Sequence, residues 1–228
     1  MTDTRDAAPS TRIPLIADMQ LLIVILLGIV SLATAYTSFQ AALYGGIQAA
    51  SYSKGGALQT EAESLYLEAN QQYLQDAQVL SRMTELSIEM DAADPVVAEL
   101  ATAKFEALLF QAVSPDLQDA IDWSVAEMDA NPDVYVSPQE SDDYLDVLFG
   151  AWSETDEESE ALLLKGDEAN GHGDRLTLNT VLMAVTLFLL GVAAVLNSRR
   201  AQWILIAVGM GIFVVAMVLT ALVPFVWL

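Results

Sequence analysis

The chain has 228 residues, no cysteine and a formal net charge of −22 at pH 7. The lack of cysteine excludes disulfides, thiol nucleophiles and thiolate metal sites. The charge is unevenly placed, because residues 54–175 carry 28 of the 31 acidic side chains and a net charge of −23. A segment this acidic repels nucleic acid and anionic lipid head groups, so nucleic acid is excluded as a partner.

Three long stretches contain no Asp, Glu, Lys, Arg or His: Met19–Ser53, Leu176–Ser198 and Ala201–Leu228. Each is at least as long as the roughly 20 residues that cross a hydrocarbon core about 30 Å thick. The sequence therefore predicts an all-α, multi-pass membrane protein with three transmembrane helices in a lipid bilayer. An acidic, bundle-like helical insert lies outside the membrane.

Residues 1–18 are polar and form the predicted cytoplasmic tail. They precede the first transmembrane helix and its extension, residues 19–53. A basic start, an apolar core and the sequence Ala33-Thr34-Ala35 also fit a cleaved secretory signal. The uncharged stretch continues far beyond this point, to Ser53, so an uncleaved anchor is favoured.

Small residues recur at every fourth position of the first helix, at Ala33, Thr37, Ala41, Gly45 and Ala49. On a helix, such a ridge allows a second backbone to approach closely, which predicts a helix-packing contact. The contact is either with a sister copy or another membrane protein, or with the other helices of the same chain, and the second alternative is favoured. Because the ridge drifts by about 40° at each step, two or three members can form one crossing.

The acidic insert, residues 54–175, begins with a strongly helix-forming stretch from Leu58 to Met90. Its apolar residues recur at three- and four-residue spacing, which is typical of an amphipathic helix. Gly55 and Gly56 precede this stretch, and two adjacent glycines are costly within a helix. The sequence leaves open whether the first transmembrane helix breaks here or continues to about residue 90.

Further helices of the insert are predicted largely from capping residues followed by proline, at Asp94-Pro95, Ser114-Pro115 and Ser137-Pro138. The expected helices cover about residues 95–113, 115–128, 138–152 and 153–170. Gly171-His172-Gly173 is expected to break the last of them before the membrane. The strand signal is limited to Val134–Val136, so a small helical bundle is expected.

Residues 176–198 and 201–228 are the predicted second and third transmembrane helices. Arg199 and Arg200 lie in the short loop between them, and Arg12 precedes the first helix. Arginine in short loops favours the cytoplasmic side, which places the N-terminus inside and the acidic insert outside the cell. Arg175 lies on the other side of the second helix and opposes this assignment.

Residues suited to catalysis or metal binding are scarce. The only histidine, His172, has no second histidine or cysteine with which to complete a metal cluster, so it is interpreted as a solvated loop residue. Acidic clusters at residues 142–146 and 154–160 lack the EF-hand pattern and are interpreted as solvated helix faces. Hydrolase, metalloprotease, phosphate-loop and dinucleotide motifs are all missing from the sequence. We therefore expect no enzyme activity, no cofactor and no bound metal.

The uncharged segments also lack the ionisable side chains that mark proton and ion pathways in membranes. Their polar side chains are neutral, and we expect them to form hydrogen bonds between helices. The side chains in question are Thr34, Thr37, Ser38, Gln40, Thr177, Asn179 and Thr180.

Two segments resemble a group of bacterial membrane proteins. In residues 35–44 an aromatic residue is followed by Gln-Ala and by another aromatic residue, as in that group after its first helix. Residues 174–182 are similar to the start of the group's second membrane helix. The resemblance implies three membrane helices with a helical insert between the first and the second, and it implies no activity.

These observations favour a non-enzymatic membrane protein, either a structural or accessory subunit or an oligomeric scaffold, whose partner is a sister copy or another membrane protein. One alternative is an extracytoplasmic sensor. Its predicted cytoplasmic parts are a short tail and a short loop, so a partner would have to carry the output. The other alternative is a channel or transporter component, which requires several copies around a neutral pore.

Overall fold

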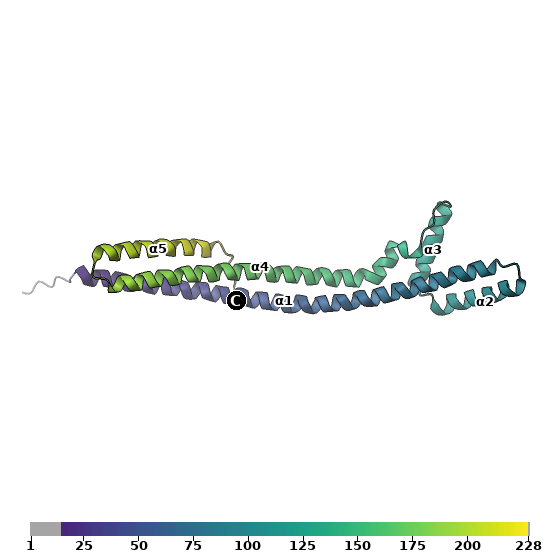
Figure 1. Ribbon diagram of the computed structural model, residues 1–228, viewed down its shortest axis with the longest axis horizontal. Coiled ribbons are helices and arrows are strands. Elements are labelled where there is room, and N and C mark those ends of the chain that lie inside the picture. The colour runs from purple at the N-terminus through teal and green to yellow at the C-terminus, as the bar shows by residue number, and fades with distance from the viewer. Residues whose placement is uncertain (1–14, 228) are drawn as a thin grey trace, which may run out of the picture. The chain divides into compact units, whose positions relative to one another are not determined.

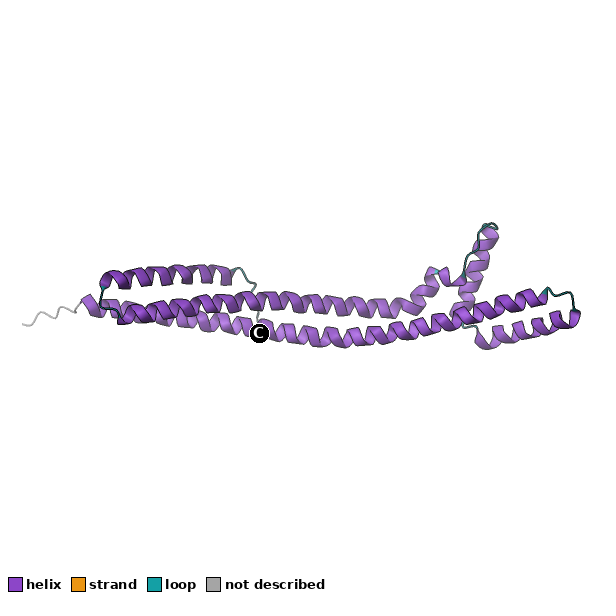
Figure 2. Ribbon diagram, viewed as in Figure 1, coloured by secondary structure: helices purple, strands orange, loops and turns teal. Residues whose placement is uncertain are grey.

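The computed structural model describes residues 15–227, with side chains from residue 19 onward. Every regular element in this part of the chain is a helix (Figure 2). The elements are α1 (Leu15–Met90), α2 (Pro95–Ala112), α3 (Pro115–Ala130), the 3₁₀ helix η1 (Pro138–Glu140), α4 (Asp142–Val195) and α5 (Arg199–Ala221). The all-α prediction is confirmed. Val134–Val136, which carry the limited strand signal, form a loop.

Three helices, α1, α4 and α5, each contain a stretch long and apolar enough to cross a membrane. This confirms the predicted set of three transmembrane helices. The third is shorter than predicted, because α5 ends at Ala221 and the residues up to Trp227 are not helical. Pro224 lies in this last segment, and proline is common just beyond a helix end. Most of the predicted tail, residues 1–14, lies outside the described residues, as does Arg12.

The chain forms two compact units. The membrane unit comprises the residues through Ser51 together with those from Leu164 onward, and it contains the apolar stretches of α1, α4 and α5. The insert unit comprises Tyr52–Leu163 and contains the rest of α1, α2, α3, η1 and the start of α4. Each unit has its own buried core.

Glycine pairs do not interrupt the two long helices (Figure 1). α1 continues through Gly55 and Gly56, so continuity is the alternative that the structure shows. α4 continues through residues 171–173, and the predicted break there was wrong. A glycine within a helix costs only about 1 kcal/mol relative to alanine, and most helical stability in proteins comes from tertiary packing.

All three predicted capping side chains accept a hydrogen bond from an amide at a helix start. The side chain of Asp94 accepts a hydrogen bond from the Val96 amide, and that of Ser114 accepts one from the Leu117 amide. The Ser137 side chain accepts one from the Gln139 amide. The helix expected from residue 138 was wrong, because Pro138–Glu140 forms only a 3₁₀ turn and α4 begins at Asp142.

The core of the membrane unit follows a seven-residue spacing on its first two helices. The buried residues Ile23, Val30, Thr37 and Tyr44 of α1 are seven apart, as are Leu176, Met183 and Leu190 of α4. On α5 the buried residues are alternately four and three apart: Gln202, Ile206, Gly209, Phe213, Ala216 and Thr220. Such spacing is typical of helices that pack with their side chains interdigitated, as in coiled coils.

Candidate functional site

Polar side chains in the middle of the membrane unit form hydrogen bonds between helices. Asn179 of α4 donates from Nδ2 to the Thr220 hydroxyl of α5 at 3.2 Å. The Thr186 hydroxyl of α4 lies 3.1 Å from the carbonyl oxygen of Gly209 on α5, and the Thr37 hydroxyl of α1 lies 3.8 Å from the Met183 sulfur of α4. These contacts connect α4 to both of its neighbours.

Gly209 marks a close approach of α5 to α4. A methyl group added at this position would lie 3.5 Å from the Leu189 Cβ and 3.7 Å from the carbonyl oxygen of Thr186. These distances are ordinary van der Waals contacts, so alanine fits here, whereas a larger side chain displaces one of the helices. Small residues at such positions let membrane helices pack through their backbones.

Side chains of α1 form hydrogen bonds with the backbone of the segment that follows α5. Gln40 donates from Nε2 to the carbonyl oxygen of Val226 at 3.3 Å and accepts from the Val226 amide at 3.1 Å. The Tyr44 hydroxyl donates to the carbonyl oxygen of Pro224 at 2.7 Å. Because a backbone beyond a helix end has unpaired polar groups, these side chains supply the partners that the missing helical turn would have provided.

Most of the neutral polar residues fall into two groups, and Thr37 belongs to both. Thr37, Gln40 and Asn179 bond to a different segment of the chain, as predicted. The hydroxyls of Thr34, Thr177 and Thr180 donate to carbonyl oxygens of their own helix, four residues earlier. The Thr37 hydroxyl also lies 2.9 Å from such an oxygen, that of Ala33. Sequence reasoning missed Thr186, Gln202 and Thr220, because a hydroxyl or amide in a uniformly apolar helix carries no local sign of which face is buried.

The predicted packing ridge lies partly within the membrane unit and partly on its surface. Thr37 is buried, and Ala33 and Ala41 are half-buried. Gly45 and Ala49 are exposed, and a methyl group added at Gly45 would meet nothing within 4 Å. A contact of the whole ridge with a second helix stays a prediction, and the exposed members are open to another chain.

His172 lies within α4, so its interpretation as a loop residue was wrong. Its Nε2 atom is 3.6 Å from a carboxylate oxygen of Glu168, one helical turn earlier, and its ring is 5.0 Å from that of Tyr44. Its Nδ1 atom is buried without a hydrogen-bond partner. Among residues 19–227, no cluster of three or more metal-ligating side chains includes it or any other residue.

The insert unit has a buried carboxylate, Asp76, which is only 1% exposed. One of its oxygens accepts a hydrogen bond from the Tyr144 hydroxyl at 2.7 Å, and the other accepts one from the Gln72 amide at 2.9 Å. Burial, with a further contribution from Asp76, raises the pKa of the Tyr144 hydroxyl above its ordinary value of 10.0. The pair joins α1 to the start of α4.

Aromatic side chains border a hollow elsewhere in the insert unit. The hollow has a volume of about 400 Å³ and is lined by Glu63, Tyr66, Leu67 and Trp152. The rings of Tyr66 and Trp152 are 5.3 Å apart, and Phe149 lies 6.0 Å from Tyr66. A negatively charged side chain beside aromatic rings is suited to a cation or to the basic side chain of a partner.

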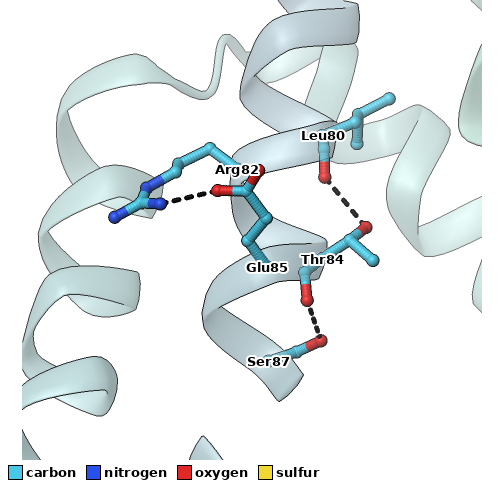
Figure 3. Close-up of polar contacts among 5 residues, drawn as sticks. All are labelled: Leu80, Arg82, Thr84, Glu85 and Ser87. Carbon is cyan, nitrogen blue, oxygen red and sulfur yellow. Dashed lines mark hydrogen bonds and ion pairs between the residues drawn. The ribbon is translucent and has the colours of Figure 1, made fainter. Parts of the chain in front are cut away.

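The surface of α1 near its end is solvated and is stabilised by local contacts (Figure 3). Arg82 forms an ion pair with Glu85 at 2.6 Å, three residues further along the same helix. The hydroxyls of Thr84 and Ser87 donate to the carbonyl oxygens of Leu80 and Thr84. Both side chains of the ion pair are exposed, so this surface is a solvated helix face. An exposed pair of this kind contributes at most about 1 kcal/mol to stability.

Arg199 and Arg200 are exposed at the start of α5. Gln202, one turn into the same helix, donates to the carbonyl oxygen of Leu196 at 2.7 Å and so closes the tight connection after α4. The two arginines therefore lie at one end of the membrane unit. No family model, curated protein or solved structure matches the chain.

Proposed function

We propose that the protein is a non-enzymatic membrane scaffold or accessory subunit. The observation that carries the proposal is that polar side chains of the membrane unit contact neighbouring helices. Thr37, Asn179 and Thr186 contact neighbouring helices of the same chain. Polar groups engaged in this way hold helices together, whereas those of a transport path must face a water-filled cavity. The membrane unit thus serves as an anchor for the insert unit.

The acidic insert faces the outside of the cell and the N-terminus faces the cytoplasm. Two observations support this orientation. Arg199 and Arg200 are exposed in the short connection between α4 and α5, where positive charge favours the cytoplasmic side. The insert unit carries 25 acidic and three basic residues, and such a surface is repelled by the anionic inner leaflet.

Single cysteines test the orientation, because the natural chain has none. Ala126→Cys places a thiol on exposed α3 of the insert unit, and Ser198→Cys places one in the connection before α5. We expect a membrane-impermeant maleimide to label the first variant in intact cells and the second only after permeabilisation. The reverse pattern would overturn the orientation.

Alkaline carbonate extraction of membranes tests the anchor, and we expect the full chain to stay in the pellet. Recovery in the supernatant would contradict the membrane assignment. Chemical crosslinking in membranes, followed by mass spectrometry, tests the scaffold itself. A defined crosslinked partner, either a sister copy or another membrane protein, is expected, and a chain that remains monomeric and without a partner would overturn the proposal.

A sensor is the second candidate, and the aromatic hollow favours it. Glu63, Tyr66 and Trp152 would hold a cationic ligand through its charge and through contact with the aromatic rings. Isothermal titration of the full protein with choline, with Trp152→Ala as the control, separates the two functions. Saturable heat that Trp152→Ala abolishes supports the sensor, and heat that is absent or equal in both proteins excludes a choline-type ligand at this hollow.

A further inference from the structure

One face of α2 is apolar and exposed. Five of its residues are alternately four and three positions apart: Val96, Leu100, Ala103, Ala107 and Phe110. Val96 is 73% exposed, Leu100 55% and Phe110 90%. This is the spacing that α5 uses for its buried residues, so the outer face of α2, as we call these five residues, has the pattern of a helix-packing surface without a helix on it.

A different face of α2 packs within the insert unit. Ala101 is buried, and Ala98, Phe105 and Leu108 are half-buried, at spacings of three and four residues. Phe105 lines a hollow together with Thr84 and other residues near the end of α1, beside which α2 lies (Figure 1). α2 therefore has two apolar faces, and only the face with Ala101 packs against the rest of the insert unit. A contiguous exposed apolar surface of this kind marks an interaction site.

The charges indicate what binds there. The insert unit carries 25 acidic and three basic residues, whereas α2 carries only Glu99, Lys104 and Glu106. Two copies of the insert unit repel each other over most of their surfaces. The outer face of α2 is nearly neutral, so it is a place where two copies approach with little repulsion.

Glu99 and Lys104 determine the direction of the pairing. They lie at the two edges of the outer face, so in a parallel pair of α2 helices each Glu99 faces Lys104 of the second copy, twice by symmetry. An antiparallel pair instead brings Glu99 close to Glu106 of the second copy. Opposite charges favour the parallel arrangement and like charges disfavour the antiparallel one.

We propose that two copies of the protein associate through the outer faces of α2, in parallel. This inference rests on the proposed scaffold function and names the partner as a second copy. A single pair of short helices buries less surface than the roughly 800 Å² per partner of a stable complex, so the contact is weak in solution. Anchoring both copies in one membrane raises their effective concentration and makes the contact effective there.

Disulfide crosslinking in membranes tests the contact. Leu100→Cys and Ala103→Cys are placed on the outer face, and Ala126→Cys, an exposed alanine of α3, is the matched control. In a parallel pair each outer-face cysteine meets its own counterpart across the two-fold axis. Mild oxidation of membranes that contain the full chain should therefore yield a disulfide dimer for both outer-face variants and little for the control.

Charge reversal tests the direction within the Ala103→Cys background. Glu99→Lys and Lys104→Glu each replace two attractive pairs by two repulsive ones, and we expect at least a roughly threefold loss of crosslinked dimer. The double variant Glu99→Lys/Lys104→Glu restores opposite charges and should restore the dimer. Residues five apart do not face each other on one helix, so a change in the stability of α2 alone would not produce this rescue.

Each other outcome contradicts the proposal. Crosslinking at residue 103 without crosslinking at residue 100 indicates an antiparallel pair, and equal crosslinking at residue 126 indicates random collision. A dimer that is missing at both outer-face positions, or a disulfide to an unlike protein, shows that a second copy does not bind there. Since carbonate extraction and maleimide labelling test the anchor separately, such a failure leaves the scaffold proposal standing.

Discussion

Alanine substitution of the adjacent glycines of α1 should have opposite effects at the two positions. A methyl group added at Gly55 would lie 3.0 Å from Cγ and Cδ2 of Leu163 and 3.2 Å from the carbonyl oxygen of Ser159. The Ser159 hydroxyl also donates to the carbonyl oxygen of Gly55 at 2.9 Å. A methyl group added at Gly56 would meet nothing within 4 Å.

The expected magnitudes follow from these distances. Alanine in place of a helical glycine stabilises by about 1 kcal/mol, which is the whole effect expected for Gly56→Ala. At Gly55 the same gain is opposed by about 1–3 kcal/mol of overpacking, because a backbone atom must move, and by a weakened hydrogen bond of about 1 kcal/mol. Gly55→Ala should therefore destabilise by about 1–3 kcal/mol, or roughly 2–4 kcal/mol relative to Gly56→Ala.

Thermal unfolding of the full chain in detergent, followed by circular dichroism, measures the difference. A separation of about 2 kcal/mol, the smallest expected, corresponds to roughly 6 °C between the two variants, with the wild type between them. The two substitutions are chemically identical and adjacent, so each controls for the other. If Gly55→Ala raises Tm as much as Gly56→Ala does, α1 and α4 do not approach closely at this point and the reasoning is refuted.

Three further outcomes are expected. Tyr144→Phe should lower the free energy of unfolding by about 1–3 kcal/mol, because buried Asp76 keeps only the hydrogen bond from Gln72, and an unchanged denaturation midpoint would contradict this. Because the pKa of Tyr144 is raised in the folded state, its contribution is complete below pH 10.0 and is lost as the pH rises further. The wild type should therefore lose more stability than Tyr144→Phe above that pH, whereas parallel curves would refute the assignment. In the membrane unit, a double-mutant cycle of Asn179→Ala and Thr220→Ala should give a coupling of about 0.6 kcal/mol, and additive effects would show that the bond contributes nothing.

Helix starts were predictable where the signal was local. Asp94-Pro95 and Ser114-Pro115 combine a capping side chain with a residue that suits the first helical position, and both form as expected. Glycine breaks were not predictable, because the small local penalty of a glycine is outweighed by contacts with residues far along the chain. Gly55 itself contacts Leu163, which no local pattern reveals.

The packing face of α1 shows the same limit. Ile23, Val30, Thr37 and Tyr44 are seven apart in the sequence, so the signal for the buried face was present. In a helix that is apolar all round, however, hydrophobic periodicity does not separate the core from the lipid-facing side. The contact of Gln40 with Val226 joins residues 186 positions apart, so it depends on the tertiary fold alone.

The threonine hydroxyls of the membrane unit have a consequence for the order of assembly. The hydroxyls of Thr34, Thr177 and Thr180 donate to the preceding turn of their own helix, so these hydroxyls need no second helix when α1 and α4 enter lipid. Asn179 and Gln40 gain their bonds only after the helices meet. Insertion into lipid and association of the helices are thus separable steps. The amide side chains form their hydrogen bonds in the second step, where they favour the correct neighbouring helix over other apolar helix surfaces.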